Sequence, residues 1–435
     1  MRAGASYGWV VLGAAFVIIT LSIGTLFTLG VFLKPIEDGM GWSRSSIGAI
    51  GLLNWLVMGL GGVVAGYLSD RFGTRRVVLA GGGILGLGLV LSSQVQQAWQ
   101  LYLTFGVLVG AGVSAFYVPL TVLAIRWFDT RRGMAAAIVS TGNGFGILVL
   151  SPLSRWLINQ FDWRAAFVVL GDLAWLIVIP CALLLRRAPQ ATRSVPLSSA
   201  GAPTWPPHHA LTPHAPTDPV PLSSAGAPTW PPHSPKGGLP VRKVLGAWPI
   251  WGIALTHFAC CAAHSGPLFH LVSHAIDQGV ASMAAATILG VSGLSSIAGR
   301  IGAGVVADRV GAKRTLIAML VAQAAMIPLY VFATSLGALS ALSLAFGVAY
   351  GGVMPLYAVV TREYFGEAIM GTAYGWVFFI SCIGMGLGSF AGGVIHDALG
   401  SYQGLFVGSF AVAAMAAMLA VTLRPPPLAP ILAPR

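Results

Sequence analysis

The sequence predicts an all-α membrane protein with twelve transmembrane helices in two similar halves, and three observations support this prediction. Hydrophobic residues make up 56% of the 435 positions and charged residues 8%, whereas a soluble domain carries about 25% charged residues. Apolar runs long enough to cross about 30 Å of hydrocarbon follow one another along almost the whole chain. One short charged motif occurs once in each half of the sequence.

The apolar runs define the helices in chain order. A helix rises 1.5 Å per residue, so about 20 apolar residues are needed to span the hydrocarbon. The first run is too long for the core of a signal peptide, and we expect it to remain as a spanning helix. The twelve expected spans are residues 8–33, 45–68, 77–95, 99–125, 133–157, 163–185, 247–275, 281–307, 315–334, 337–361, 368–395 and 402–423.

Basic residues are distributed unequally between the two sides of the predicted bundle. This asymmetry predicts that both termini are cytoplasmic, because positive loops stay inside. The formal charge of +12 therefore indicates membrane orientation rather than nucleic-acid binding. The expected outward-facing residues are Lys34, Arg44, Arg155 and Arg164, and the expected cytoplasmic residues are Arg71, Arg75, Arg76, Arg126, Arg131, Arg132, Arg186, Arg187, Arg309, Lys313, Arg314 and Arg362.

A segment rich in proline, serine, alanine and glycine separates the two halves. Residues 188–244 lack the apolar periodicity needed to bury a core, so we expect a disordered cytoplasmic linker between halves at 1–187 and 245–435. Within it the sequence VPLSSAGAPTWPPH occurs at Val195–His208 and again at Val220–His233. The repeat is either a docking motif for a partner or, as we favour, an insertion that a surface loop tolerates.

The cysteines and histidines of the chain do not suggest a metal or a cofactor. Cys181, Cys260, Cys261 and Cys382 all fall inside apolar runs, where they are expected to pack rather than to form disulfides or a zinc site. The linker histidines have irregular, proline-broken spacing that differs from that of a structural zinc site.

A charged motif follows the second span and recurs after the eighth span. GYLSDRFGTRR covers Gly66–Arg76 and GVVADRVGAKR covers Gly304–Arg314. Glycines allow a tight turn, and each Asp can bond a helix N-terminus and a nearby Arg. Positive-inside charge alone explains the basic residues but not the glycine spacing. We expect a gate that holds one conformation shut, formed by Gly66, Asp70, Arg71, Gly73, Arg75, Arg76, Asp308, Arg309, Gly311 and Arg314.

The motif in these two loops resembles the signature loop of the major facilitator superfamily. The resemblance covers the whole chain apart from the linker. The resemblance implies six plus six helices around a central cavity that opens alternately to each side. Further segments resemble the bacterial branch of the monocarboxylate transporter family. This resemblance implies transport of a small carboxylate such as lactate or pyruvate, usually together with a proton. It also implies that the protein acts as a monomer in a bacterial cytoplasmic membrane. These segments are Tyr7–Phe16, Gly30–Glu37, Arg126–Gly146, His270–Gly279 and Ala298–Arg309.

Arg300 supports an anionic substrate independently of the resemblance. It lies eight residues before Asp308, which places it about 12 Å into the membrane. A guanidinium at that depth needs a wet cavity or an acidic partner, and its planar fork matches a carboxylate. The alternative is an internal salt bridge, with Asp172 as the expected partner. The resembled family carries its substrate-binding arginine at this position.

The expected proton-coupling group is less well defined. Ser296 and Phe27 stand where animal members of the resembled family have an Asp and a Lys, so those groups cannot couple protons here. His270, which can titrate near neutral pH, is the preferred coupling and binding candidate, and Asp172 is the second. The remaining expected pocket residues are Tyr117, Asn143, Tyr350 and Tyr374.

Other function classes lack their characteristic residues. The chain has no P-loop motif for an ATP-driven pump and no cluster of nucleophile, base or metal ligands for an enzyme. A transporter-like sensor would normally carry an ordered output domain. An oxalate-type dicarboxylate exchanger would need a second cation, and residues 372–395 contain neither Lys nor Arg.

Overall fold

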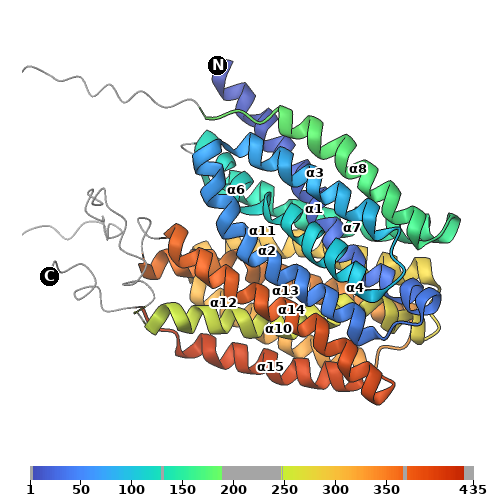
Figure 1. Cartoon of the computed structure of the whole chain (residues 1–435). Helices are drawn as coiled ribbons and strands as arrows, with labels where there is room; N and C mark the ends of the chain where they lie inside the picture. The colour runs from blue at the N-terminus through green and yellow to red at the C-terminus, as the bar shows by residue number, and fades with distance from the viewer. Residues whose placement is uncertain (1–2, 129–131, 189–245, 247, 366–369, 426–435) are drawn as a thin grey trace, which may run out of the picture. The chain divides into compact units, whose positions relative to one another are not determined.

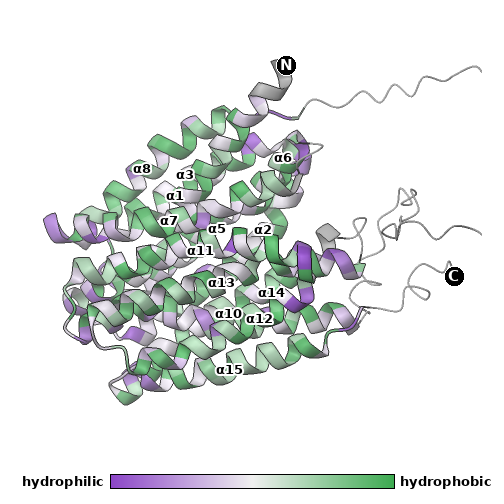
Figure 2. Cartoon of the chain, turned by 180° about the vertical axis from the view of Figure 1, so that it is seen from behind, coloured by the Kyte–Doolittle hydropathy of each residue, from purple (hydrophilic) through white to green (hydrophobic). Residues whose placement is uncertain are grey.

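A computed structural model describes residues 3–128, 132–188, 246, 248–365 and 370–425 of the chain. Throughout these residues the regular structure is helical, which confirms the all-α prediction. Eleven of the helices are long and apolar enough to cross a membrane. Hydrophobic residues run along their lengths and hydrophilic residues gather towards their ends (Figure 2).

The N-terminal half contains the first six expected spans. The fourth span is broken at Ala115 and Phe116. Pro119 explains this break, since a proline ring clashes with the carbonyl four residues earlier. The first three spans are α1 (Ala3–Met40), α2 (Arg44–Phe72) and α3 (Thr74–Ser92). The fourth span consists of α4 (Ala98–Leu101), the π-helical η1 (Tyr102–Val109), α5 (Gly110–Ser114) and α6 (Tyr117–Trp127). The fifth and sixth spans are α7 (Arg132–Gln160) and α8 (Trp163–Leu183).

The C-terminal half contains the other six expected spans. α10 (Trp248–Asp277) corresponds to the seventh expected span, but it is not among the eleven helices that qualify on length and hydropathy. Four histidines, at 257, 264, 270 and 274, lower its mean hydropathy. The other helices are α11 (Ser282–Val310), α12 (Ala312–Met326) with η2 (Ile327–Val331), α13 (Leu336–Phe365), α14 (Met370–Leu399) and α15 (Gln403–Thr422).

The repeated motif folds into the same turn in both halves. Gly73 joins α2 to α3 with φ 92° and ψ 140°, and Gly311 joins α11 to α12 with φ 95° and ψ 144°. Side chains are strained at such positive φ values, so glycine is required at both positions. Each glycine N–H donates to a helix carbonyl 2.9 Å away, that of Ser69 or Ala307. The glycine spacing of the motif therefore has a structural cause.

The two halves pack closely, chiefly through α2 with α14 and α7 with α11. Figure 1 shows the N-terminal helices, blue to green, beside the C-terminal helices, yellow to red. Gly144 and Gly293 allow the backbones of α7 and α11 to approach, because a Cβ on Gly144 would lie 2.6 Å from the Gly293 carbonyl oxygen. The halves thus form one compact unit, Met1–Ala188 with Leu239–Arg435. The expected linker lies outside the described residues from position 189 onwards.

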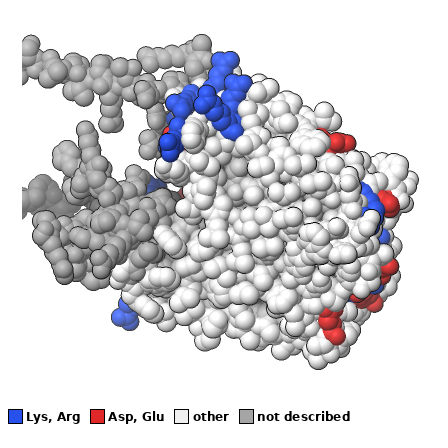
Figure 3. All heavy atoms as spheres, viewed as in Figure 1, with Lys and Arg blue, Asp and Glu red and all other residues white. Residues whose placement is uncertain are grey.

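Charged side chains gather at the helix ends. In Figure 3, Lys and Arg cluster where α2 joins α3, and acidic side chains lie towards the opposite ends of the helices. Arg71, Arg75 and Arg76 are exposed at this joint. Two of the arginines expected on the outer side are instead held by the protein: Arg44 is 2% exposed, and Arg164 donates to the carbonyls of Ser93 and Val95 at 2.8 and 2.7 Å.

Candidate functional site

Arg300 lies on α11 as a half-buried cation without a counter-ion among the described residues. Its Nε is buried and has no hydrogen-bond partner within the described part of the chain. Asp172, the expected salt-bridge partner, is exposed on α8, and α8 packs against α1, α3 and α7. The internal ion pair considered from the sequence is therefore not formed in this structure. A guanidinium in this environment favours an anion that arrives from outside the protein.

The three expected pocket tyrosines lie within electrostatic reach of Arg300. Its charge acts electrostatically on the phenols of Tyr117, Tyr350 and Tyr374, which come from α6, α13 and α14. The rings of Tyr117 and Tyr374 both pack on Phe378, with centroids 5.7 and 6.4 Å away. The structure thus brings together one tyrosine from the N-terminal half and two from the C-terminal half. Their hydroxyls can donate hydrogen bonds to an anion held by Arg300.

Asn143 lies at the crossing of α7 and α11, beside the Gly144–Gly293 contact. Its side-chain oxygen is buried and has no hydrogen-bond partner among the described residues. No described contact joins Asn143 to Arg300, so its assignment to the same pocket stays a prediction.

His264 is a member of this site that the sequence reasoning missed. It lies on α10, is 1% exposed and stacks on Tyr350 with ring centroids 5.5 Å apart. Arg300 also acts on its ring electrostatically. The sequence does contain a signal for this residue, namely four histidines in one spanning helix. Ionisable residues are rare in membrane segments unless they have a function.

His270 lies towards the C-terminal end of α10, in a cluster that the described contacts do not join to Arg300. Its Nε2 lies 2.9 Å from the Ser389 carbonyl oxygen and its Nδ1 lies 3.0 Å from the Tyr402 hydroxyl. Both ring nitrogens are therefore engaged, and the described contacts of His270 do not include Arg300. The sequence analysis chose His270 because imidazole titrates near neutral pH. The packing of α10 places it in a second cluster near the helix ends.

That second cluster joins the two halves, and we call it the outer closure: Glu37, Arg44, His270, Asp277, His396, Asp397 and Tyr402. Arg44 from the N-terminal half donates to Asp277 at 3.0 Å and to the Tyr402 hydroxyl at 2.7 Å, both in the C-terminal half. Its Nε also bonds Glu37 at 3.0 Å. Asp397 accepts from the backbone N–H groups of Arg44 and Ser45, which begin α2, at 3.1 and 2.8 Å.

At the opposite helix ends the repeated motif makes weaker contacts. Arg126 donates to Asp70 at 3.1 Å, and the side chains are 56% and 68% exposed. This is the expected bond between the motif Asp and a nearby Arg, although exposed pairs contribute little stability. In the second copy, Asp308 is exposed and forms no ion pair with the residues that the structure describes. The gating residues Arg71, Arg75, Arg76, Arg309 and Arg314 are also exposed.

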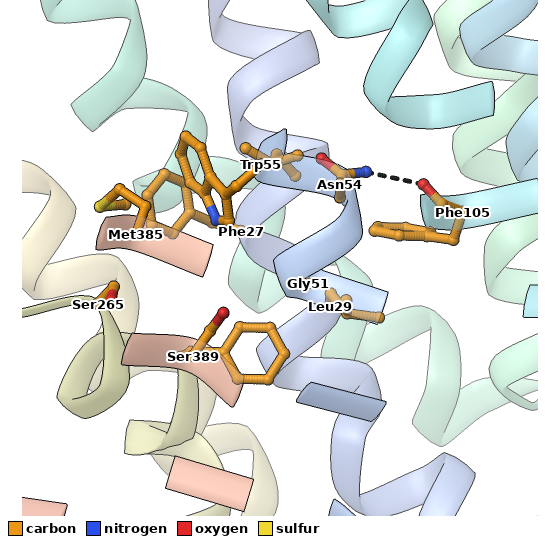
Figure 4. Close-up of a pocket in the computed structure, with 11 residues that line it drawn as sticks. Phe27, Leu29, Gly51, Asn54, Trp55, Phe105, Ser265, Met385 and Ser389 are labelled. Atoms are coloured by element: carbon orange, nitrogen blue, oxygen red, sulfur yellow. Dashed lines mark hydrogen bonds between the residues drawn. The ribbon is translucent and has the colours of Figure 1, made fainter. Parts of the chain in front are cut away.

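A separate small pocket lies between the halves (Figure 4). Phe27 and Trp55 line it with ring centroids 5.9 Å apart, and Asn54 donates to the Phe105 carbonyl at 2.7 Å. Arg300 is not among the lining residues, so the pocket offers no charge to an anion. The lining residues are Leu26, Phe27, Leu29, Gly51, Asn54, Trp55, Phe105, Ser265, Phe269, Met385 and Ser389.

Known transporters resemble this chain in sequence. A family model described as Major Facilitator Superfamily matches residues 15–388 and 296–435. The chain is 28% identical over 411 residues to Monocarboxylate transporter 13 of Bos taurus, covering 94% of this chain and 87% of that protein. It is 29% identical over 410 residues to Monocarboxylate transporter 11 of Mus musculus, covering 92% and 84%.

Solved structures show a similar fold. A bacterial homologue of the human lysosomal transporter Spinster, in an inward-facing and unoccupied conformation, has a TM-score of 0.66 at 16% identity and covers 97% of both chains. A mutant of the nucleoside transporter NupG has a TM-score of 0.68 at 13% identity, covering 96% of this chain and 99% of that one. At these identities the likeness concerns the fold alone.

Proposed function

This chain belongs to the major facilitator superfamily, and from this we propose that it is a secondary transporter of small monocarboxylates such as lactate or pyruvate. The proposal includes alternating access and the movement of a proton with the anion. It also places the protein, as a monomer with both termini cytoplasmic, in a bacterial cytoplasmic membrane. The names of the two full-length relatives support the substrate class.

The observation that carries the proposal is the guanidinium of Arg300, which has no counter-ion in the part of the chain that the structure describes. A half-buried cation of this kind is costly, and a monocarboxylate supplies one negative charge with two oxygens that match the guanidinium fork. Tyr117 and Tyr350 offer neutral donors for the remaining lone pairs or for a substrate hydroxyl. The site therefore supplies one permanent positive charge to one anionic group.

A dicarboxylate is the second candidate, and the charges around Arg300 disfavour it. A dianion in a low-dielectric site requires a second permanent cation. The described part of α14 contains no Lys or Arg between residues 370 and 399. No observation favours a transporter-like sensor over a transporter.

We infer that the proton is coupled by a group other than the two sequence candidates, His270 and Asp172. Asp172 is exposed on α8, which packs chiefly against α1, α3 and α7. His270 would have to break a hydrogen bond to Tyr402 or Ser389 before it could exchange a proton. Its position supports a role in the outer closure.

Replacement of Arg300 by Lys tests the proposal. Arg300→Lys keeps one positive charge but removes the planar fork, so we expect the half-saturating lactate concentration in proteoliposome counterflow to rise about tenfold or more. Arg424→Lys, an exposed arginine after α15, is the matched control and should behave as the unmodified protein. Normal lactate affinity in Arg300→Lys would show that the carboxylate site lies elsewhere.

A further inference from the structure

We propose that His264 carries the proton that accompanies the anion, which makes it the coupling residue of the site built on Arg300. This inference rests on the proposed function and names the group that function needs. Four observations support it: the tautomer of the ring, its burial, its neighbours and the absence of a nearby carboxylate within the described residues.

The hydrogen bonding of His264 leaves one nitrogen available. Its Nδ1 lies 2.8 Å from the backbone carbonyl oxygen of Cys260. A carbonyl can only accept, so Nδ1 carries the hydrogen and Nε2 holds the lone pair. No described residue forms a hydrogen bond with Nε2. His270 differs in this respect, since both of its nitrogens are engaged.

The groups that face His264 come from several helices. Arg300 on α11 acts on it electrostatically, Tyr350 on α13 stacks on it, and His257 interacts with it along α10. Cys260 lies beside it, with Sγ 3.9 Å from Nδ1, and Cys260 Sγ in turn lies 3.7 Å from Gln323 Oε1 on α12. None of the described contacts brings a carboxylate to the ring.

These neighbours make protonation depend on the substrate. In the empty site a proton on His264 would place a second positive charge near Arg300, and like charges in a dehydrated site repel. A carboxylate bound to Arg300 offsets that charge and attracts a proton to Nε2. Anion and proton therefore promote each other's binding, and by linkage the effect is reciprocal. One proton and one monoanion cross together and leave the net charge of the site unchanged.

The experiment compares two kinds of lactate uptake into proteoliposomes: counterflow at equal pH, and uptake driven by an inward proton gradient. The readout is the ratio of gradient-driven to equal-pH uptake, because it does not depend on how much protein is folded. We expect this ratio to exceed one for the unmodified protein and to fall to about one for His264→Gln, while counterflow is slowed but retained. His274→Gln, which changes a histidine of the same helix that lies outside both the site and the outer closure, should keep the ratio of the unmodified protein.

A full gradient response in His264→Gln would overturn the proposal, and so would an equal loss of the response in His274→Gln. A second measurement needs no variant: the unmodified protein in weakly buffered detergent solution should take up protons when lactate is added. Absence of that uptake also overturns the proposal. Failure of the proposed function is distinguishable, because the unmodified protein would then show no lactate counterflow at all.

Discussion

At the scale of single residues, the site combines one charge with several neutral donors. Arg300 supplies the charge, while Tyr117, Tyr350 and Tyr374 supply hydroxyls that interact with it electrostatically. Tyr117 is the only one of these three tyrosines that comes from the N-terminal half. An anion that contacts both Arg300 and Tyr117 would therefore bridge the two halves.

Tyr117→Phe tests this bridging role. The variant keeps the ring that packs on Phe378 but loses the hydroxyl, which in comparable cases costs about 0.5–1.5 kcal/mol, or about two- to tenfold in affinity. We therefore expect the half-saturating lactate concentration to rise by about two- to tenfold. Tyr67→Phe, on an exposed tyrosine of α2, is the control. An unchanged lactate affinity in Tyr117→Phe would remove Tyr117 from the site.

At the scale of helices, the outer closure ties α1 and α2 to α10, α14 and α15. Arg44 is almost fully buried and is shared between Glu37, Asp277 and Tyr402. Removal of one partner of a buried ion pair is destabilising, since the other charge is left uncompensated. The closure is therefore strong while it is complete, and under the proposed alternating access we expect it to break when the outer side opens.

Arg44→Gln should shift the protein towards an outward-open state. A cysteine introduced at Met385, in the pocket between the halves, reports this shift through its labelling rate with an impermeant maleimide added outside. With the native cysteines replaced, we expect labelling to accelerate several-fold in Arg44→Gln. Arg164→Gln is the matched control, because its carbonyl partners Ser93 and Val95 lie in its own half. Equal labelling rates in both variants would contradict a gating role for Arg44.

At the scale of the whole molecule, the repeated turn at Gly73 and Gly311 shows that the two halves share one local design. The duplicated sequence lies outside the described residues. We expect transport to depend on the helices rather than on this segment, because a surface loop tolerates insertions.

Deletion of residues 220–233 should leave transport and stability unchanged, because one copy of the repeat remains. Lactate counterflow and the thermal unfolding temperature of the purified protein provide the measurements. Deletion of residues 195–208 removes the other copy and leaves a chain of the same length, so both deletions should behave alike. Loss of counterflow in either variant would reveal a functional role for the repeat.

The sequence by itself determined the helices, the repeated halves and the place of Arg300 within a spanning helix, because apolar length and charge position depend only on order along the chain. Only the tertiary structure decided that Asp172 is exposed, that His270 belongs to the outer closure and that His264 adjoins Arg300. The physical reason is that a spanning helix is apolar on the side facing lipid and on the side facing protein. Its sequence therefore shows how deep a residue lies but only weakly which neighbour it faces, and that is decided by packing between helices.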